Sequence, residues 1–130
     1  MLLDTSGLLC LHHKLEPLHH DAVAMYRTAT VRLTHNYVLS EFVALAHVRR
    51  MPRGPAIETV RDLLRNPEVT VVWVDQQLHE SAVDLLLARR DKTYSLCDAV
   101  SFLVMRDNNM TEALTSDHHF EQEGFKRLLV

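Results

Sequence analysis

The sequence predicts an α/β fold in which a mainly parallel sheet lies between helices. Short apolar or β-branched runs alternate with longer segments of helical periodicity along the 130 residues. No repeat or linker interrupts this alternation, and the bend at Pro52, Gly54 and Pro55 falls between two helical segments. We therefore expect residues 1–130 to form a single domain, since this length suits one hydrophobic core.

Each element follows from its local pattern. The clearest strand is "VTVVWV", and Asp75 after it is expected to cap the next helix, because its side chain can accept a bond from a free backbone amide. The expected strands are residues 1–4, 30–34, 69–74, 112–115 and 126–130. The expected helices are residues 7–13, 18–28, 36–50, 55–65, 76–90 and 96–108, with a short helical turn before the last strand.

Composition narrows the class of protein. With 47% hydrophobic and 24% charged residues the chain is globular rather than disordered. The net charge of −3 argues against indiscriminate coating of nucleic acid, which depends on many Lys and Arg contacts to phosphate. A local basic patch that binds nucleic acid remains an alternative. However, each basic cluster lies at the end of a predicted helix, where positive charge interacts favourably with the helix dipole in any protein. The clusters are Arg49, Arg50 and Arg53, and Arg89, Arg90 and Lys92.

The same chain carries no sign of export. No apolar run approaches the ~18 residues that span a bilayer, and Asp4 interrupts the apolar segment where a secretory signal would lie. We expect a soluble, cytoplasmic protein. Cys10 and Cys97 show no paired spacing, so we expect no disulfide and assign them no role.

Two acids are expected at the ends of strands. Asp4 follows the first apolar run, and Asp117 follows the apolar residues, Thr115 and Ser116 of "EALTSD". Ligands of open parallel sheets collect beyond the carboxyl ends of the strands, so both carboxylates are expected in one crevice. Taken alone, Asp117 could simply cap a helix at residues 118–122.

Two further acids lie in the first halves of apolar helices. Glu41 in "NYVLSEFVALAHV" has apolar neighbours at helical spacing, so we expect it within the buried stripe, where it would need a cation from the protein or a metal. Taken alone, Glu41 could instead form a buried salt bridge or lie at the edge of the stripe in contact with water. Asp98 in "YSLCDAVSFLVM" lies beside a face that should pack, and Ser95 with Asp98 also fits a capping box. Each acid alone has a structural explanation, whereas four directed to one sheet edge do not.

Four carboxylates in one crevice repel one another unless a hard cation neutralises them. Oxygen ligands without a Cys or His motif favour Mg²⁺ or Mn²⁺ over zinc. Such ions polarise phosphates and lower the pKa of bound water. The chemistry that this pattern suggests is phosphodiester hydrolysis.

These four acids and their neighbours resemble the four acidic motifs of PIN domains, and they occur in the same order along the sequence. They occur in "LLDTSGLL", "YVLSEFVALA", "YSLCDAVSFLVM" and "ALTSDHHFEQEGF", which together cover essentially the whole chain. The resemblance implies a three-layer α/β/α sandwich and a metal-dependent endoribonuclease that cleaves RNA. Asp4, Glu41, Asp98 and Asp117 would hold Mg²⁺ or Mn²⁺ or position the attacking water. Chains of this size are similar to VapC-type toxins, which implies a homodimer and inhibition by a small antitoxin.

Neighbouring polar residues have weaker assignments. Ser6 and Ser116 could hold metal-bound water, although turn roles suit both. After Asp117 many PIN domains carry a basic residue, whereas His118 and His119 stand here, and His119 could assist near phosphate. We expect the nine histidines to lie mostly on the surface.

Two other functions remain open at this point. One is a PIN-like module that binds RNA or a protein without cutting. The other is a receiver-type domain with Asp75 as the phosphoacceptor, although the acidic pair and the lysine that such domains need are missing.

Overall fold

The computed structural model describes residues 1–130, in which five strands form one sheet in the order β3-β2-β1-β4-β5. Every neighbouring pair of strands is parallel. The strands are β1 (Leu2–Leu3), β2 (Arg32–His35), β3 (Val69–Val72), β4 (Glu112–Leu114) and β5 (Lys126–Arg127). The predicted α/β class with a mainly parallel sheet is confirmed.

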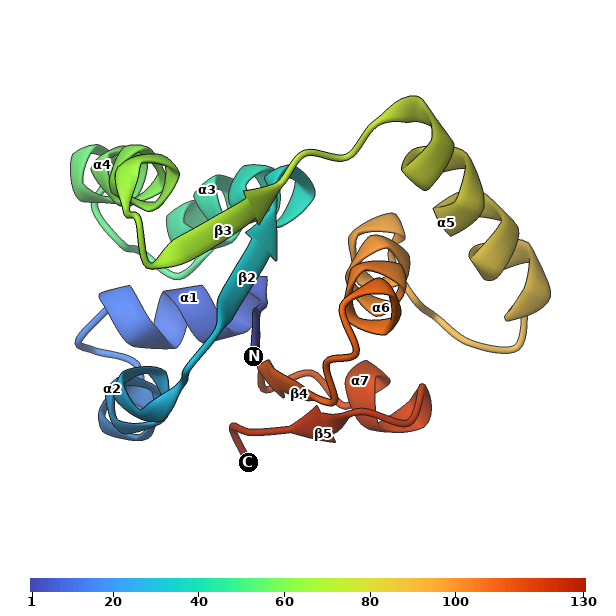
Figure 1. Ribbon diagram of the computed structural model, residues 1–130. Helices are drawn as coiled ribbons and strands as arrows, with labels where there is room; N and C mark the ends of the chain where they lie inside the picture. Colours follow the sequence, from blue (N-terminus) through green and yellow to red (C-terminus); the bar gives the residue numbers. More distant parts are fainter.

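Seven helices cover the two faces of this sheet (Figure 1). One layer contains α1 (Thr5–His12), α2 (His19–Thr28), α3 (Asn36–Val48) and α4 (Arg53–Arg65). The other contains α5 (Gln76–Ala88), α6 (Leu96–Asp107) and α7 (His119–Gln122). The three-layer sandwich is therefore also confirmed. None of these helices combines the length and the apolar character that crossing a bilayer requires.

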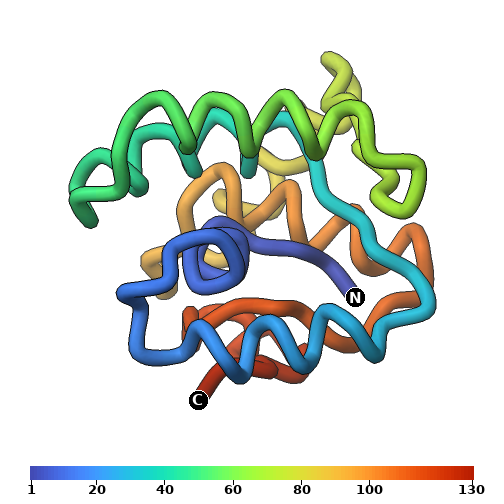
Figure 2. Tube along the Cα trace, turned by 90° about the vertical axis from the view of Figure 1, so that its left-hand side faces the viewer, coloured from blue at the N-terminus to red at the C-terminus, as the bar shows by residue number.

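Alternation along the short strands creates a core on each face of the sheet. Leu3 packs with Phe42 in the core beneath α1–α4, whereas its neighbour Leu2 packs with Phe102 in the core beneath α5–α7. All four side chains are fully buried. Figure 2 views the molecule from the α1–α4 side and shows α3 and α4 running beside each other.

Helix α1 lies directly against β4 because Gly7 faces that strand. A Cβ atom added at Gly7 would lie 1.8 Å from the carbonyl oxygen of Leu114, so no side chain fits there. The helix begins at Thr5, immediately after Asp4 and two residues before the predicted start. This close approach brings the first turn of α1 next to the residues that follow β4.

Candidate active site

The carboxyl ends of β1 and β4 bring two acids together. Leu3 pairs with Leu114 in the sheet, so Asp4 lies beside Thr115. The Thr115 hydroxyl donates to Oδ2 of Asp4 at 2.7 Å, and its oxygen accepts the backbone N–H of Asp117 at 3.0 Å. One buried threonine thus joins the two strand-end acids, as expected from the sheet-edge rule.

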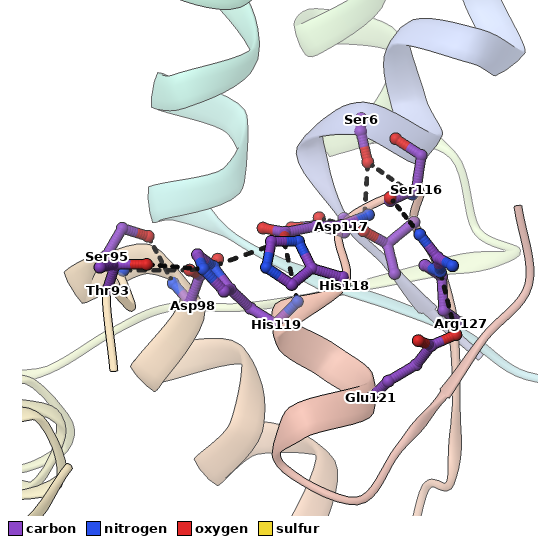
Figure 3. Close-up of polar contacts among 12 residues, drawn as sticks. Ser6, Thr93, Ser95, Asp98, Ser116, Asp117, His118, His119, Glu121 and Arg127 are labelled. Carbon is purple, nitrogen blue, oxygen red and sulfur yellow. Dashed lines mark hydrogen bonds and ion pairs between the residues drawn. The ribbon is translucent and has the colours of Figure 1, made fainter. Parts of the chain in front are cut away.

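Two serines extend this hydrogen-bond network around Thr115. Ser6 Oγ lies 3.1 Å from Thr115 Oγ1, and because Thr115 gives its proton to Asp4, Ser6 is the donor. The Ser6 oxygen in turn accepts the backbone N–H of Ser116 at 3.0 Å. Figure 3 shows both serines beside Asp117. The bonds of Ser6 to the protein favour a structural role, whereas Ser116 is exposed.

Asp98 enters the site from the first turn of α6. Its Oδ2 accepts the N–H of Ser95 at 3.0 Å, and Ser95 Oγ accepts the N–H of Asp98 at 3.0 Å, which completes the predicted capping box. His119 lies between two acids: its Nδ1 is 3.0 Å from Asp98 Oδ2 and 3.4 Å from Asp117 Oδ1 (Figure 3). Capping and participation in an acidic cluster are therefore compatible for Asp98.

For Glu41 the expectation of burial was wrong, and the alternative of a stripe edge in contact with water is what the structure shows. Its side chain is exposed rather than part of the buried stripe of α3. That stripe is formed by Val38, Leu39, Phe42 and Ala46, whereas Ala44 and Val48 are exposed despite being apolar. Glu41 nevertheless lies near enough to the other acids for its charge to contribute to the raised pKa of Asp4.

The four acids share one electrostatic environment. The pKa of Asp4 is raised to about 7, mainly by burial and in smaller part by the negative charges of Asp98 and Glu41. The hydrogen bond from Thr115 acts in the opposite direction and lowers it. Burial also raises the pKa of Asp98, with a contribution from Asp117 and opposing hydrogen bonds from Ser95 and His119. Asp4, Glu41, Asp98 and Asp117 therefore converge from four separate segments of the chain.

No arginine or lysine of the chain pairs with this cluster. Asp4 and Glu41 form no ion pair, and Asp98 and Asp117 approach only His118 and His119, not an arginine or lysine. Oδ1 of Asp98 accepts no hydrogen bond from the protein. Asp117, His118 and His119 each offer one atom that could bind a metal, and these three atoms lie within 4.8 Å of one another. Carboxylate oxygens without a counter-charge fit a hard divalent cation.

Three buried residues of the site escaped sequence reasoning. Thr115 directly precedes Ser116 and Asp117, and its position at the end of a strand was the available signal. Cys97 lies among Glu41, Asp4 and Asp98, and burial together with these charges raises its pKa, so its thiol stays protonated and is no nucleophile. No spacing motif marked Cys97.

The third is His35, which joins the two helices that carry acids. Its Nδ1 accepts the N–H of Val38 at 3.3 Å at the start of α3, and its Nε2 lies 2.8 Å from Ser101 Oγ on α6. Burial lowers its pKa to about 4, so the ring is neutral and Nε2 is the donor. His35 thereby fixes the helix of Glu41 against the helix of Asp98.

Known proteins resemble this chain in both sequence and fold. The 23S rRNA-specific endonuclease VapC20 of Mycobacterium tuberculosis, found in strains CDC 1551 and H37Rv, is 30% identical over 126 residues, which is 96% of this chain and 95% of the relative. The crystal structure of M. tuberculosis VapC20, described as a Sarcin-Ricin loop cleaving toxin, superimposes with a TM-score of 0.89 and 27% identity over 99% of this chain and 98% of that one. The PIN domain model matches residues 1–126 and so spans all four acidic motifs, and the chain belongs to the PIN-domain family.

Proposed function

We propose that this protein is a metal-dependent endoribonuclease that hydrolyses RNA phosphodiester bonds and serves as the toxin of a type II toxin–antitoxin pair. The observation that carries the proposal is the convergence of Asp4, Glu41, Asp98 and Asp117 without a neutralising arginine or lysine. Such a cluster is unfavourable by itself and suits a site that binds a cation. Family membership supports the same chemistry.

The acids would divide the work of metal binding. Asp4, Asp98 and Asp117 would hold Mg²⁺ or Mn²⁺, and the exposed Glu41 would complete the ligand set or orient the attacking water. A bound divalent cation supplies charge stabilisation at phosphorus and a more acidic water. Thr115 keeps Asp4 oriented by occupying Oδ2.

His119 would act mainly by positioning. Its Nδ1 lies between Asp98 and Asp117, and its Nε2 is 3.0 Å from Thr93 Oγ1, so both ring nitrogens already have partners. This favours alignment of the two carboxylates over direct phosphate contact. Ser116, whose side chain is exposed, is better placed to meet water or phosphate.

The substrate we propose is a structured loop of ribosomal RNA, since the similar VapC20 is named for 23S rRNA. The test is incubation of the purified protein with a sarcin–ricin stem-loop and a scrambled control, in Mn²⁺ and in EDTA. We expect one discrete cut that requires the metal and the native loop. Asp117→Asn should abolish it, whereas Glu58→Gln, an exposed acid on α4, should not.

Two outcomes would contradict this function. Equal cleavage by Asp117→Asn would identify a contaminating nuclease. Binding of the stem-loop without cleavage in any divalent metal would favour the alternative of a non-catalytic RNA-binding module.

We also propose a homodimer that is inhibited by a small antitoxin. Helix α5 packs against α6 and leaves Val83 and Leu87 partly exposed at 38% and 52%, which suits contact with a second copy. A pocket whose lining combines apolar residues such as Leu11, Val23 and Leu63 with polar and charged ones offers a place for an antitoxin segment. Light scattering of the purified protein and co-purification of a small co-expressed neighbour test the two proposals separately.

A further inference from the structure

A second pocket adjoins the acidic cluster, at the junction of α1, the α1–α2 loop and α3. It has a volume of about 330 Å³, at the lower end of the range for small-molecule sites. Its lining includes Ser6 and Ser116; Ser6 bonds to Thr115, the residue that joins Asp4 to Asp117. Its apolar walls are Leu9, Pro17, Leu18 and Leu45. The pocket is therefore an extension of the candidate active site.

A buried carboxylate with an unused oxygen lines this pocket. The side chain of Glu16 is only 6% exposed, and its Oε2 accepts a bond of 2.7 Å from Nη2 of Arg49. Its Oε1 is buried and has no hydrogen-bond partner. A buried carboxylate oxygen without a partner is unfavourable, so it calls for a donor that the chain itself does not supply.

Helix α3 connects this pocket to the acids. Glu41, Leu45 and Arg49 follow one another at intervals of four residues and therefore lie along one side of the helix. At 1.5 Å per residue, Arg49 is about 12 Å from Glu41 along the helix axis. A single RNA strand that crosses the acidic cluster could therefore continue along this side of the helix to Arg49.

Positive charge gathers at the far end of this path. The side chain of Arg49 is 51% exposed although it pairs with Glu16, which leaves donors free for a ligand. Arg50 and His13 line the adjoining hollow together with Glu16 and Arg49. Arg49 and Arg50 belong to the first of the two basic clusters in the sequence, and positive side chains of this kind attract phosphate.

We propose that this pocket binds one base of the RNA close to the scissile phosphate, and that it prefers guanine. Guanine offers adjacent N1–H and N2–H donors for the Glu16 carboxylate and adjacent O6 and N7 acceptors for the Arg49 guanidinium. The other bases offer one of these pairs at most. The apolar walls would cover the base faces. This inference rests on the proposed ribonuclease function and adds its base selectivity.

Sequencing of the products of a randomised RNA library tests the proposal. The wild type should favour guanine at one fixed position close to the cut. Glu16→Gln and Arg49→Ala should each reduce that preference by roughly 5- to 100-fold, the range for loss of a paired base contact. Arg90→Ala removes an equal charge from an exposed helix end outside the pocket and should leave the preference unchanged. Melting curves identify any variant that fails to fold, and Arg49, being half exposed, is the safer of the two.

Titration with guanosine 5′-monophosphate separates this inference from the nuclease proposal. Without any cleavage, we expect guanosine monophosphate to shift the amide resonances of Cys10 and Leu18 at concentrations where the other three nucleotides do not, and Arg49→Ala to abolish the shifts. If the wild type cleaves but both variants keep its base preference, the pocket does not read the base. A lack of nucleotide binding, or binding of an antitoxin peptide there instead, would also overturn the proposal.

Discussion

The carboxylate of Asp98 has two roles: it caps the start of α6 and it belongs to the acidic cluster. Oδ2 accepts the Ser95 amide and approaches His119, and Oδ1 stays free. We expect Asp98→Asn, measured without metal, to leave thermal stability unchanged or higher, because asparagine can still accept the Ser95 amide while the repulsion from Asp117 disappears. The same change should abolish Mn²⁺-dependent cleavage. Calorimetry in EDTA and an RNA assay measure the two effects.

Ser95→Ala is the matched control. It removes the other half of the capping box and should lower the free energy of unfolding by about 1 kcal/mol while cleavage persists. If Asp98→Asn instead lost that much stability and kept its activity, Asp98 would be a cap alone.

Asp4 gives the metal-free protein a distinctive pH dependence. Its folded pKa of about 7 exceeds the ordinary value of 3.8, so its contribution to stability is complete below pH 3.8 and is lost as pH rises to 7. Asp4→Asn lacks this titration. We expect the variant to gain on the wild type by at most roughly 1.4 kcal/mol per pH unit across that window. Urea unfolding in EDTA at several pH values measures the difference.

A stability difference that stays constant from pH 4 to 7 would contradict the raised pKa of Asp4. The comparison with the variant matters because His35 titrates in the opposite sense. Its pKa is lowered from 6.5 to about 4, so the wild type loses stability as pH falls through that range. In the wild type, the titrations of Asp4 and His35 change stability in opposite directions and partly cancel. The difference between the wild type and Asp4→Asn isolates the contribution of Asp4.

The residues that the sequence could place are those tied to strand ends. Asp4 and Asp117 were predicted to meet because parallel strands end at one sheet edge, and the structure joins them through Thr115. Glu41 was expected within the buried stripe because apolar residues surround it in the sequence. Their presence alone does not determine which side of the helix packs against the core, and Ala44 and Val48 are exposed.

Among the elements, α1 depends most on a single residue. Gly7 lets α1 approach β4 closely enough for Ser6 to meet Thr115. Gly7→Ala would force a Cβ to within 1.8 Å of the Leu114 carbonyl oxygen, so we expect a loss of about 3 kcal/mol or more, the upper end for overpacking. Chemical denaturation measures it, and activity should fall with it because the serine network moves.

Gly54 on α4 provides the contrast, since nothing lies within 4 Å of an added Cβ there. Gly54→Ala should be neutral or stabilising by up to about 1 kcal/mol, because alanine favours a helix. Equal losses from both variants would show that the close approach of α1 to β4 is unimportant.

The elements themselves were largely predictable, because the periodicity changes clearly between strands and helices. Their ends were less so. The strand predicted at 69–74 stops at Val72, and the last strand is confined to Lys126–Arg127 rather than 126–130. Strand ends depend on the length of the neighbouring strand, which local sequence does not contain. The Asp75 cap was local and is confirmed by its bond to the Leu78 amide at 2.8 Å.

At the scale of the whole molecule, one sheet with central β1 brings together acids that are far apart in the sequence. Their order along the chain predicted the PIN-like sandwich, and the fold and the family are confirmed. The pairing of Glu16 with Arg49 and the burial of Cys97 and His35 could not be predicted, because they depend on how separate helices pack over that sheet.

A crystal structure of the protein soaked in Mn²⁺, with anomalous scattering recorded, tests the central claim most directly. We expect an anomalous peak within about 2.0–2.5 Å of carboxylate oxygens from at least two of Asp4, Asp98 and Asp117, and no such peak in Asp98→Asn. Manganese bound only at surface histidines, or none bound while the acids remain together, would contradict the claim that these carboxylates form a cation site.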